Sequence, residues 1–253
     1  MKKTKLSPAQ KELQAVCKEE AKIHKQALAS NKETWKNGIE KKIPDKVRSS
    51  LEVAFCKAFY IVFEKGTIVI EKTYDKKGLE KDYQINDFAA QIKGGRKELR
   101  KVSKDAQRSN RTNMALSTLE GIGLGALGIG LPDIVLFVGM LLKGIYETAI
   151  RYGFSYESNA EKLLILKMME AAMQKGDAWE ALNGQIDELL LEHSPEDVSK
   201  DALDEQIQRT ARVFALDMLI LKFVQGLPVV GIIGGVGNPV YYRKIMRYVQ
   251  LKY

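Results

Sequence analysis

The chemical pattern that stands out first in this chain is a glycine motif with the spacing of a nucleotide-binding loop. Gly123, Gly125 and Gly128 match G-x-G-x-x-G, and Glu147 follows nineteen residues after the last glycine. A dinucleotide site requires a strand before such a loop and a βαβ unit around it. Here a basic segment precedes the glycines and Pro132 interrupts the residues after them, so we do not expect a nucleotide site.

Metal and nucleophilic chemistry lack the residues that they need. His24 and His193 are the only histidines, and Cys17 and Cys56 are the only cysteines. The sequence has no His-Glu-x-x-His motif, cysteine pair or acidic cluster with the spacing of metal ligands or of a catalytic triad. Two separate cysteines also fit a reducing compartment. We therefore expect a protein that is not an enzyme and that holds no cofactor and no metal.

Two long apolar tracts dominate the sequence, and the elements that they form must position any functional side chains. Residues 121–142 contain one charge, that of Asp133, and residues 223–242 contain none. Each tract is long enough to cross a hydrocarbon core of about 30 Å. Each also contains Gly-Leu-Pro and further glycines, which destabilise an isolated helix. Three interpretations stay open: a membrane-spanning segment, a peripheral or re-entrant contact with a membrane, and the core of a soluble domain.

Asp133 has two interpretations. At the centre of a bilayer a carboxylate costs roughly 2.5 to 3.5 kcal/mol, and such residues tend to be functional. Directly after Pro132, however, the same carboxylate would meet the unpaired N–H groups of a first helical turn. We favour this capping role.

The basic charge of the chain is confined to its first half. Residues 1–112 contain 27 Lys and Arg against 15 Asp and Glu, whereas residues 113–253 contain 13 against 17. This asymmetry suits an anionic partner, either the cytoplasmic leaflet or nucleic acid, although a solvated basic surface has the same composition. The partner that we expect is anionic membrane lipid or a membrane protein. Nucleic acid is a weaker prediction because the most basic stretch, residues 93–111, lacks aromatic residues.

Basic residues and one aromatic pair are the candidate membrane contacts. The tyrosine pair and the two cations after it have the pattern of an interfacial anchor, and they equally fit the start of an amphipathic C-terminal helix. The basic N-terminus lacks the apolar segment of a secretory signal, so we expect the cytoplasm, on the inner face of the plasma membrane. The candidate contacts are Arg96, Lys97, Arg100, Lys101, Lys104, Arg108, Arg111, Tyr241, Tyr242, Arg243 and Lys244.

Helix signals cover the first third of the chain. Ser7-Pro8-Ala9-Gln10 has the residues of a capping box and opens a polar helix that we expect to reach about Ser30. Pro44 opens a second helix with a strong apolar stripe, and Gly66 is its expected end. Residues 67–73 fit either a short strand or a helical turn.

Similar signals mark the later helices. Gly153 is the expected left-handed terminator of the helix that begins at Pro132, and Lys143, Glu147 and Arg151 are expected on its charged outer face. Helices are expected from Gln84 to Ser117 with a break, from Pro132 to Tyr152, after the capping box Ser158-Asn159-Ala160-Glu161, after Asp177, and from Ser194-Pro195 to Gln225.

The sequence thus predicts an all-α protein. We expect one multi-helix domain of about seven or eight helices, because no segment has the alternation of a sheet strand. Gly-Leu-Pro occurs in both glycine-rich apolar tracts, and we expect the two tracts to pack together as helices. Residues 1–44 form a basic, amphipathic N-terminal helix in this interpretation, and residues 45–253 form the helical domain.

The residues around and after the first tract resemble the EcsC protein family. The resemblance rests on Gly130-Leu131-Pro132-Asp133, on Glu147 and Arg151-Tyr152-Gly153-Phe154 in and after the next helix, on the segment 161–169, and on the late tract 226–238. It extends over about residues 45 to 250. Ile134-Val135 departs from the family pattern, which has an apolar residue followed by proline after the aspartate. The matching motif positions are Gly130, Pro132, Asp133, Glu147, Tyr152 and Gly153.

The resemblance implies little chemistry. The family is named for a gene beside those of an ABC transporter, its members are mostly bacterial, and membrane association is a common expectation for them. We therefore expect a peripheral protein of the cytoplasmic leaflet, accessory to an ABC transporter or to another membrane protein. The alternative is a soluble helical domain that binds a lipid or another hydrophobic ligand in its apolar core.

Overall fold

All regular secondary structure that the structure describes is helical, which confirms the all-α prediction. The structure is a computed structural model, and it describes residues 6–29, 38–115, 132–191, 198–224 and 238–253. Ten α-helices and one π-helical turn, η2, occur in these residues. They are α1 (Pro8–Ala29), α3 (Asp45–Ile61), η2 (Val62–Gly66), α4 (Thr67–Glu71), α5 (Lys76–Lys93), α6 (Arg96–Ala115), α7 (Pro132–Arg151), α8 (Asn159–Met173), α9 (Gly176–Leu191), α10 (Lys200–Val224) and α11 (Asn238–Lys252).

Two helices begin with the predicted capping boxes. At the start of α1, Ser7 Oγ accepts a hydrogen bond from the Gln10 N–H at 3.2 Å, and Gln10 Oε1 accepts one from the Ser7 N–H at 2.9 Å. Ser158 and Glu161 make the same reciprocal bonds at the start of α8. These bonds satisfy N–H groups that a helix end leaves without a backbone partner.

The predicted helix end at Gly66 is wrong. The chain continues through η2 into α4, so of the two alternatives for residues 67–73, a short strand or a helical turn, the structure shows the helical one, from residue 67 to residue 71. Gly66 has right-handed helical angles, and a Cβ atom there would lie 3.1 Å from Val62 Cγ1. The glycine relieves crowding inside the π-helical turn and does not terminate the helix.

The expected long helix before the second tract is present as α10. It begins at Lys200, where Ser199 Oγ accepts a hydrogen bond from the Ala202 N–H at 3.2 Å. Ser194 and Pro195, the predicted start, lie outside the described residues. The break expected in the basic segment is the left-handed Gly94, with φ of 55°, between α5 and α6.

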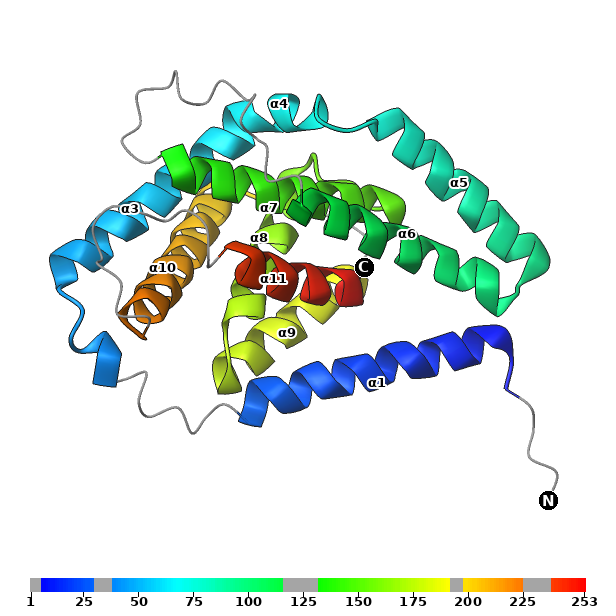
Figure 1. Cartoon of the computed structure of the whole chain (residues 1–253), viewed down its shortest axis with the longest axis horizontal. Coiled ribbons are helices and arrows are strands. Elements are labelled where there is room, and N and C mark those ends of the chain that lie inside the picture. Colours follow the sequence, from blue (N-terminus) through cyan, green and yellow to red (C-terminus); the bar gives the residue numbers. More distant parts are fainter. Residues whose placement is uncertain (1–5, 30–37, 116–131, 192–197, 225–237) are drawn as a thin grey trace.

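The core lies where α3, α7, α8 and α10 meet (Figure 1). The ring of Phe214 on α10 contacts Phe55 and Phe59 of α3 and Phe137 of α7, with centroid distances from 5.7 to 6.2 Å. None of these four side chains is more than 1% exposed. Aromatic rings from three helices therefore fill the centre of the domain.

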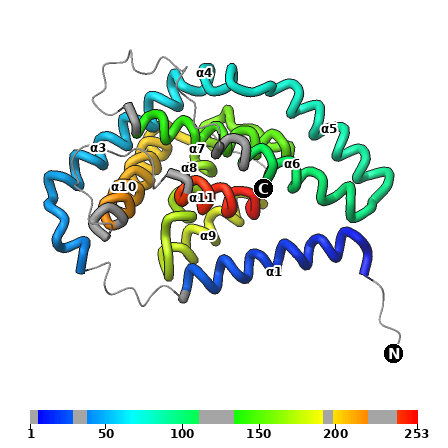
Figure 2. The backbone as a smooth tube through the Cα atoms, viewed as in Figure 1, coloured from blue at the N-terminus to red at the C-terminus, as the bar shows by residue number. Residues whose placement is uncertain are grey.

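A hairpin of α5 and α6 and the long helix α1 form the periphery (Figure 2). The hairpin packs on α7, while α1 contacts α6, α9 and α11. Near the start of α1, Glu12 pairs with Arg96 and Arg100 of α6. Near its end, the His24 ring lies 5.4 Å from the Trp179 ring of α9. The proposed division of the chain after residue 44 stays a prediction.

The helices that contain the C-terminal ends of the two apolar tracts, α7 and α11, pack against each other. Phe137 of α7 and Tyr241 of α11 have ring centroids 6.4 Å apart, and a Cβ atom on Gly144 would overlap the Tyr242 hydroxyl. The glycines before these helices, at 121–131 and 226–237, lie outside the described residues, so their packing stays a prediction. In the part of the chain that the structure describes, no helix is long and apolar enough to cross a membrane.

Gly153 terminates α7 as predicted. Its φ is 82°, its N–H donates to the Ile150 carbonyl at 3.0 Å, and the Phe154 N–H donates to the Ala149 carbonyl at 2.9 Å. A Cβ atom at this position would also overlap the ring of Tyr83 on α5. The glycine thus sets both the end of α7 and the close approach of α5.

We expect Gly153→Ala to lower the free energy of unfolding by about 2 to 4 kcal/mol, because the left-handed conformation and the overlap with Tyr83 both oppose a methyl group. Guanidinium denaturation followed by far-UV circular dichroism measures this loss. Gly184→Ala is the matched control, since Gly184 is an exposed position of α9 with no atom near its Cβ, where alanine should add about 1 kcal/mol. An unchanged stability of Gly153→Ala would contradict the packing described here.

Candidate functional site

Glu147 is a buried carboxylate at the interface of α7 and α6. Its side chain is 5% exposed, and it accepts hydrogen bonds from Ser109 of α6 and from Lys143 Nζ, the latter at 2.5 Å. The face of α7 that carries Lys143, Glu147 and Arg151 was expected to be the charged outer face. This expectation is wrong, because α5 and α6 cover α7 on this side and leave Lys143 and Arg151 only partly exposed.

A chain of polar contacts continues from this interface to α11. Asn110 Nδ2 donates to Thr148 Oγ1 at 3.3 Å, and the Tyr242 hydroxyl donates to Asn110 Oδ1 at 3.3 Å. All three side chains are buried, so these bonds compensate for lost hydration. Polar contacts therefore join α6, α7 and α11 inside the domain.

A cavity of about 540 Å³ lies beside Glu147. Its walls carry both signs of charge, including Asp82, Asp105, Arg108 and Lys143. Such a balanced lining does not select a cation or an anion. Among the described residues, no three His, Cys, Asp or Glu side chains are grouped so that they could hold a metal ion.

Tyrosines link the corner between α4 and α5 to the loop after α7. The hydroxyls of Tyr74 and Tyr156 lie 2.8 Å apart, and Tyr156 donates to Glu71 Oε1 at 2.6 Å. Burial raises the pKa of both tyrosines, so they remain protonated donors. Burial alone would also raise the pKa of Glu71, but hydrogen bonds from Tyr156 and Lys76 lower it below its usual value. This arrangement suits a structural connection and not a tyrosine nucleophile.

The basic residues of α6 divide into two groups. Lys97, Lys101, Lys104 and Arg108 follow i, i+4, i+7 and i+11 spacing, and all four are exposed. They form one stripe, called the basic stripe below. The remaining candidates of this helix are Arg96 and Arg100, which pair with Glu12, and Arg111, whose side chain lies outside the described ones.

The ion pairs between α6 and α1 change the pKa of Glu12. Hydrogen bonds from Arg96 and Arg100 lower the pKa of the Glu12 carboxyl, against a smaller opposing effect of burial. Arg100 Nε donates to Glu12 Oε2 at 2.9 Å. These two arginines therefore act within the fold, whereas the three lysines of the basic stripe are exposed and Arg108, at its end, also lines the cavity beside Glu147.

The interfacial interpretation of the tyrosine pair is wrong. Tyr241 is 4% exposed and packs on Phe137, and Tyr242 is 1% exposed and bonds to Asn110. The structure shows the other interpretation, the start of an amphipathic C-terminal helix. Of the two cations after the pair, Arg243 is exposed and Lys244 is half-buried.

A second stripe, apolar and exposed, was missed in the sequence. Ile85, Phe88 and Ile92 of α5 are 56%, 64% and 66% exposed. Their i, i+3, i+7 spacing, called the apolar stripe below, was the available signal, although such spacing usually marks a core face. The opposite side of α5 contains the buried Leu79 and Asn86. Both helices of the hairpin pack on α7 (Figure 2), and the residues of the apolar stripe and the lysines of the basic stripe are exposed to solvent.

The remaining motif positions cluster at the ends of α7. Pro132 begins the helix, and Asp133 follows in its first turn, with a side chain outside the described ones. Tyr152 is half-buried after the last turn, and burial raises its pKa. Gly130 lies outside the described residues. The capping role of Asp133 stays a prediction.

Replacement of Lys143 by methionine should leave the Glu147 carboxylate buried without its ammonium partner. We expect Lys143→Met to lower the free energy of unfolding by about 3 to 5 kcal/mol. Lys143→Met combined with Glu147→Gln should recover most of that loss, since no buried charge remains. Thermal and guanidinium denaturation of both variants measure the effect, and equal losses in the single and double variants would show that the pair is not coupled.

Comparison with known proteins was made for the whole chain. Neither the curated proteins nor the solved structures include a significant match. The model of the EcsC protein family matches residues 7–253, which adds α1 to the region of resemblance noted in the sequence. The match thus extends over nearly the entire chain, and the protein belongs to the EcsC protein family.

Proposed function

We propose that this protein is a non-enzymatic, peripheral membrane protein of the cytoplasmic leaflet that binds anionic lipid through the outward side of its α5–α6 hairpin. The observation that carries the proposal is that the two helices of one hairpin expose an apolar stripe on α5 and a basic stripe on α6. Amphipathic surfaces with cations and exposed aliphatic or aromatic side chains bind in the interface of anionic bilayers. The apolar stripe matches the acyl boundary of that interface, and the basic stripe matches its headgroups.

The expected free energies of the two stripes support binding to a membrane. Each Lys or Arg near an anionic leaflet contributes about 1 kcal/mol, so the three lysines of the basic stripe contribute about 3 kcal/mol, or roughly two orders of magnitude in binding. Insertion of Ile85, Phe88 and Ile92 adds hydrophobic free energy in proportion to the area that leaves water. The two contributions together exceed what the basic charge could supply alone.

Other functions have less support. A lipid in the apolar core is not favoured, because the rings of Phe55, Phe59, Phe137 and Phe214 already occupy its centre. Nucleic acid would need aromatic side chains for stacking among the cations, and residues 97–108, which carry the basic stripe, contain none. An accessory role beside an ABC transporter follows from the family name alone, and the hairpin surface supplies only its membrane part.

Cosedimentation with vesicles tests the apolar stripe. Full-length protein should bind vesicles of phosphatidylglycerol and phosphatidylcholine, and Phe88→Asp with Ile92→Asp should lower that binding by about tenfold or more, because two carboxylates replace the inserted side chains. Val53→Asp, at a position of α3 that is 50% exposed, is the control and should bind as the wild type does. Wild-type binding by the double variant would refute the proposed surface.

The basic stripe is tested by its dependence on charge. Lys97→Gln, Lys101→Gln and Lys104→Gln together should lower binding to the same vesicles by about a hundredfold, and the wild type should bind poorly to pure phosphatidylcholine. Added salt should release the wild type because exposed charges are screened. Equal binding to neutral and anionic vesicles would exclude the electrostatic part of the proposal.

Cell fractionation distinguishes peripheral attachment from insertion. Membranes from cells that produce the full-length protein should release it on washing with high salt or alkaline carbonate, as expected for a surface contact. Retention until detergent is added would contradict the peripheral proposal and would indicate that residues of the two apolar tracts enter the bilayer.

A further inference from the structure

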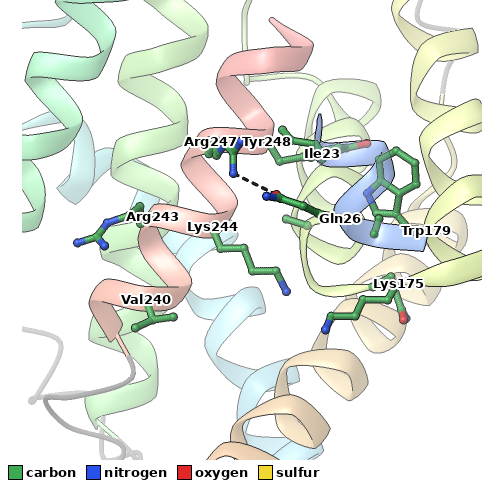
Figure 3. A pocket seen from close by; sticks show the side chains of 12 residues that line it. Ile23, Gln26, Lys175, Trp179, Val240, Arg243, Lys244, Arg247 and Tyr248 are labelled. Carbon is green, nitrogen blue, oxygen red and sulfur yellow. Dashed lines mark hydrogen bonds between the residues drawn. The ribbon is translucent and has the colours of Figure 1, made fainter. Parts of the chain in front are cut away.

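A second surface feature, separate from the hairpin, lies between α1, α9 and α11. It is a pocket of about 420 Å³, within the size range of small-molecule sites. Trp179, Tyr248 and Ala172 form apolar walls, together with Ile23 and Ala27 of α1 (Figure 3). We call it the α11 pocket. It shares no lining residue with the basic or the apolar stripe.

Four cationic side chains line the same pocket: Lys175, Arg243, Lys244 and Arg247. Figure 3 shows Lys175 and Lys244 extending toward one another from opposite sides of the opening. Arg247 is held in place by Glu19, to which its Nε donates at 2.9 Å, and by Gln26 at 3.3 Å. The described lining residues carry no carboxylate, but Glu19 beside the pocket forms an ion pair with Arg247 and offsets its charge.

Two helix ends add to this positive potential. α9 begins at Gly176, next to Lys175, and α11 begins at Asn238, just before Val240 at the pocket. The N-terminus of a helix has a partial positive charge and N–H groups without helical partners. Both helices are long enough for this effect, with 16 and 15 residues. Side chains and backbone therefore favour an anion at the same place.

We propose that the α11 pocket binds a phosphate monoester carried on an apolar or aromatic body. A phosphate monoester has a charge of about −1.5 to −2 at neutral pH and three acceptor oxygens, which matches several cations better than a single carboxylate does. Trp179 and Tyr248, which are 3% and 2% exposed, form the apolar base of the pocket under the body of the ligand. Two sources share this chemistry, a lipid such as phosphatidate and a soluble aromatic phosphate.

Calorimetric titration of the full chain with monomeric ligands tests the site without vesicles, so that a failure of membrane binding by the hairpin leaves the result unaffected. Dihexanoyl phosphatidate and 1-naphthyl phosphate represent the two sources, and saturable one-to-one binding of either supports the proposal and identifies the source. Inorganic phosphate should bind at least about tenfold more weakly, since it lacks an apolar body. Equal binding of inorganic phosphate would overturn the role of the apolar walls.

Charge and shape are tested by separate variants. Lys175→Gln with Lys244→Gln should weaken binding of the better ligand by about tenfold or more, whereas the exposed pair Lys41→Gln with Lys46→Gln should leave it unchanged. Val240→Trp, at a position 59% exposed, should weaken binding to a similar extent by obstructing the opening. Wild-type affinity in both pocket variants, or equal affinity for dihexanoyl phosphatidylcholine, would overturn the proposal.

Discussion

The fold depends on the burial of α7 on every side. This helix contacts α3, α5, α6 and α11, and its apolar residues from Ile134 to Ile150 are almost entirely shielded from water. A helix in that position can retain an ionisable side chain only where a neighbour supplies compensating charge or hydrogen bonds. Glu147, with Lys143 and Ser109, is that exception, and it determines which side of α6 must face inward. The outward orientation of the basic stripe follows from the same constraint.

Local signals in the sequence predicted the helix ends that are built from neighbouring residues. The capping boxes at Ser7 and Ser158 and the terminator Gly153 depend only on a few neighbouring residues, so the sequence alone predicts them. Gly66 could not be interpreted in this way, because a glycine that ends a helix and one that relieves crowding within a turn have the same sequence signal. Packing against Val62 decides between them.

Surface chemistry was predicted less well than helix ends, because composition does not specify the partner of a side chain. The sequence identified α6 as basic, but it could not show that Arg96 and Arg100 pair with Glu12, more than eighty residues away. Tyr241 and Tyr242 have the residue types of an interfacial anchor, but both are buried in the core. The sequence could not show which residues they would contact. Conversely, the spacing of the apolar stripe on α5 resembles a buried face, and only the three-dimensional arrangement shows that none of the described helices covers it.

The attachment of α1 differs along its length, and this gives the helix a gradient of stability. Its first turns are held by the partly exposed pairs between Glu12 and the arginines of α6, contacts of a kind that contributes little and weakens with salt. Its last turns bury Ala27 and lay His24 against Trp179, contacts that salt does not screen. Amide hydrogens should therefore exchange first at the N-terminal end, and faster at high ionic strength, while the turns that wall the α11 pocket keep their protection.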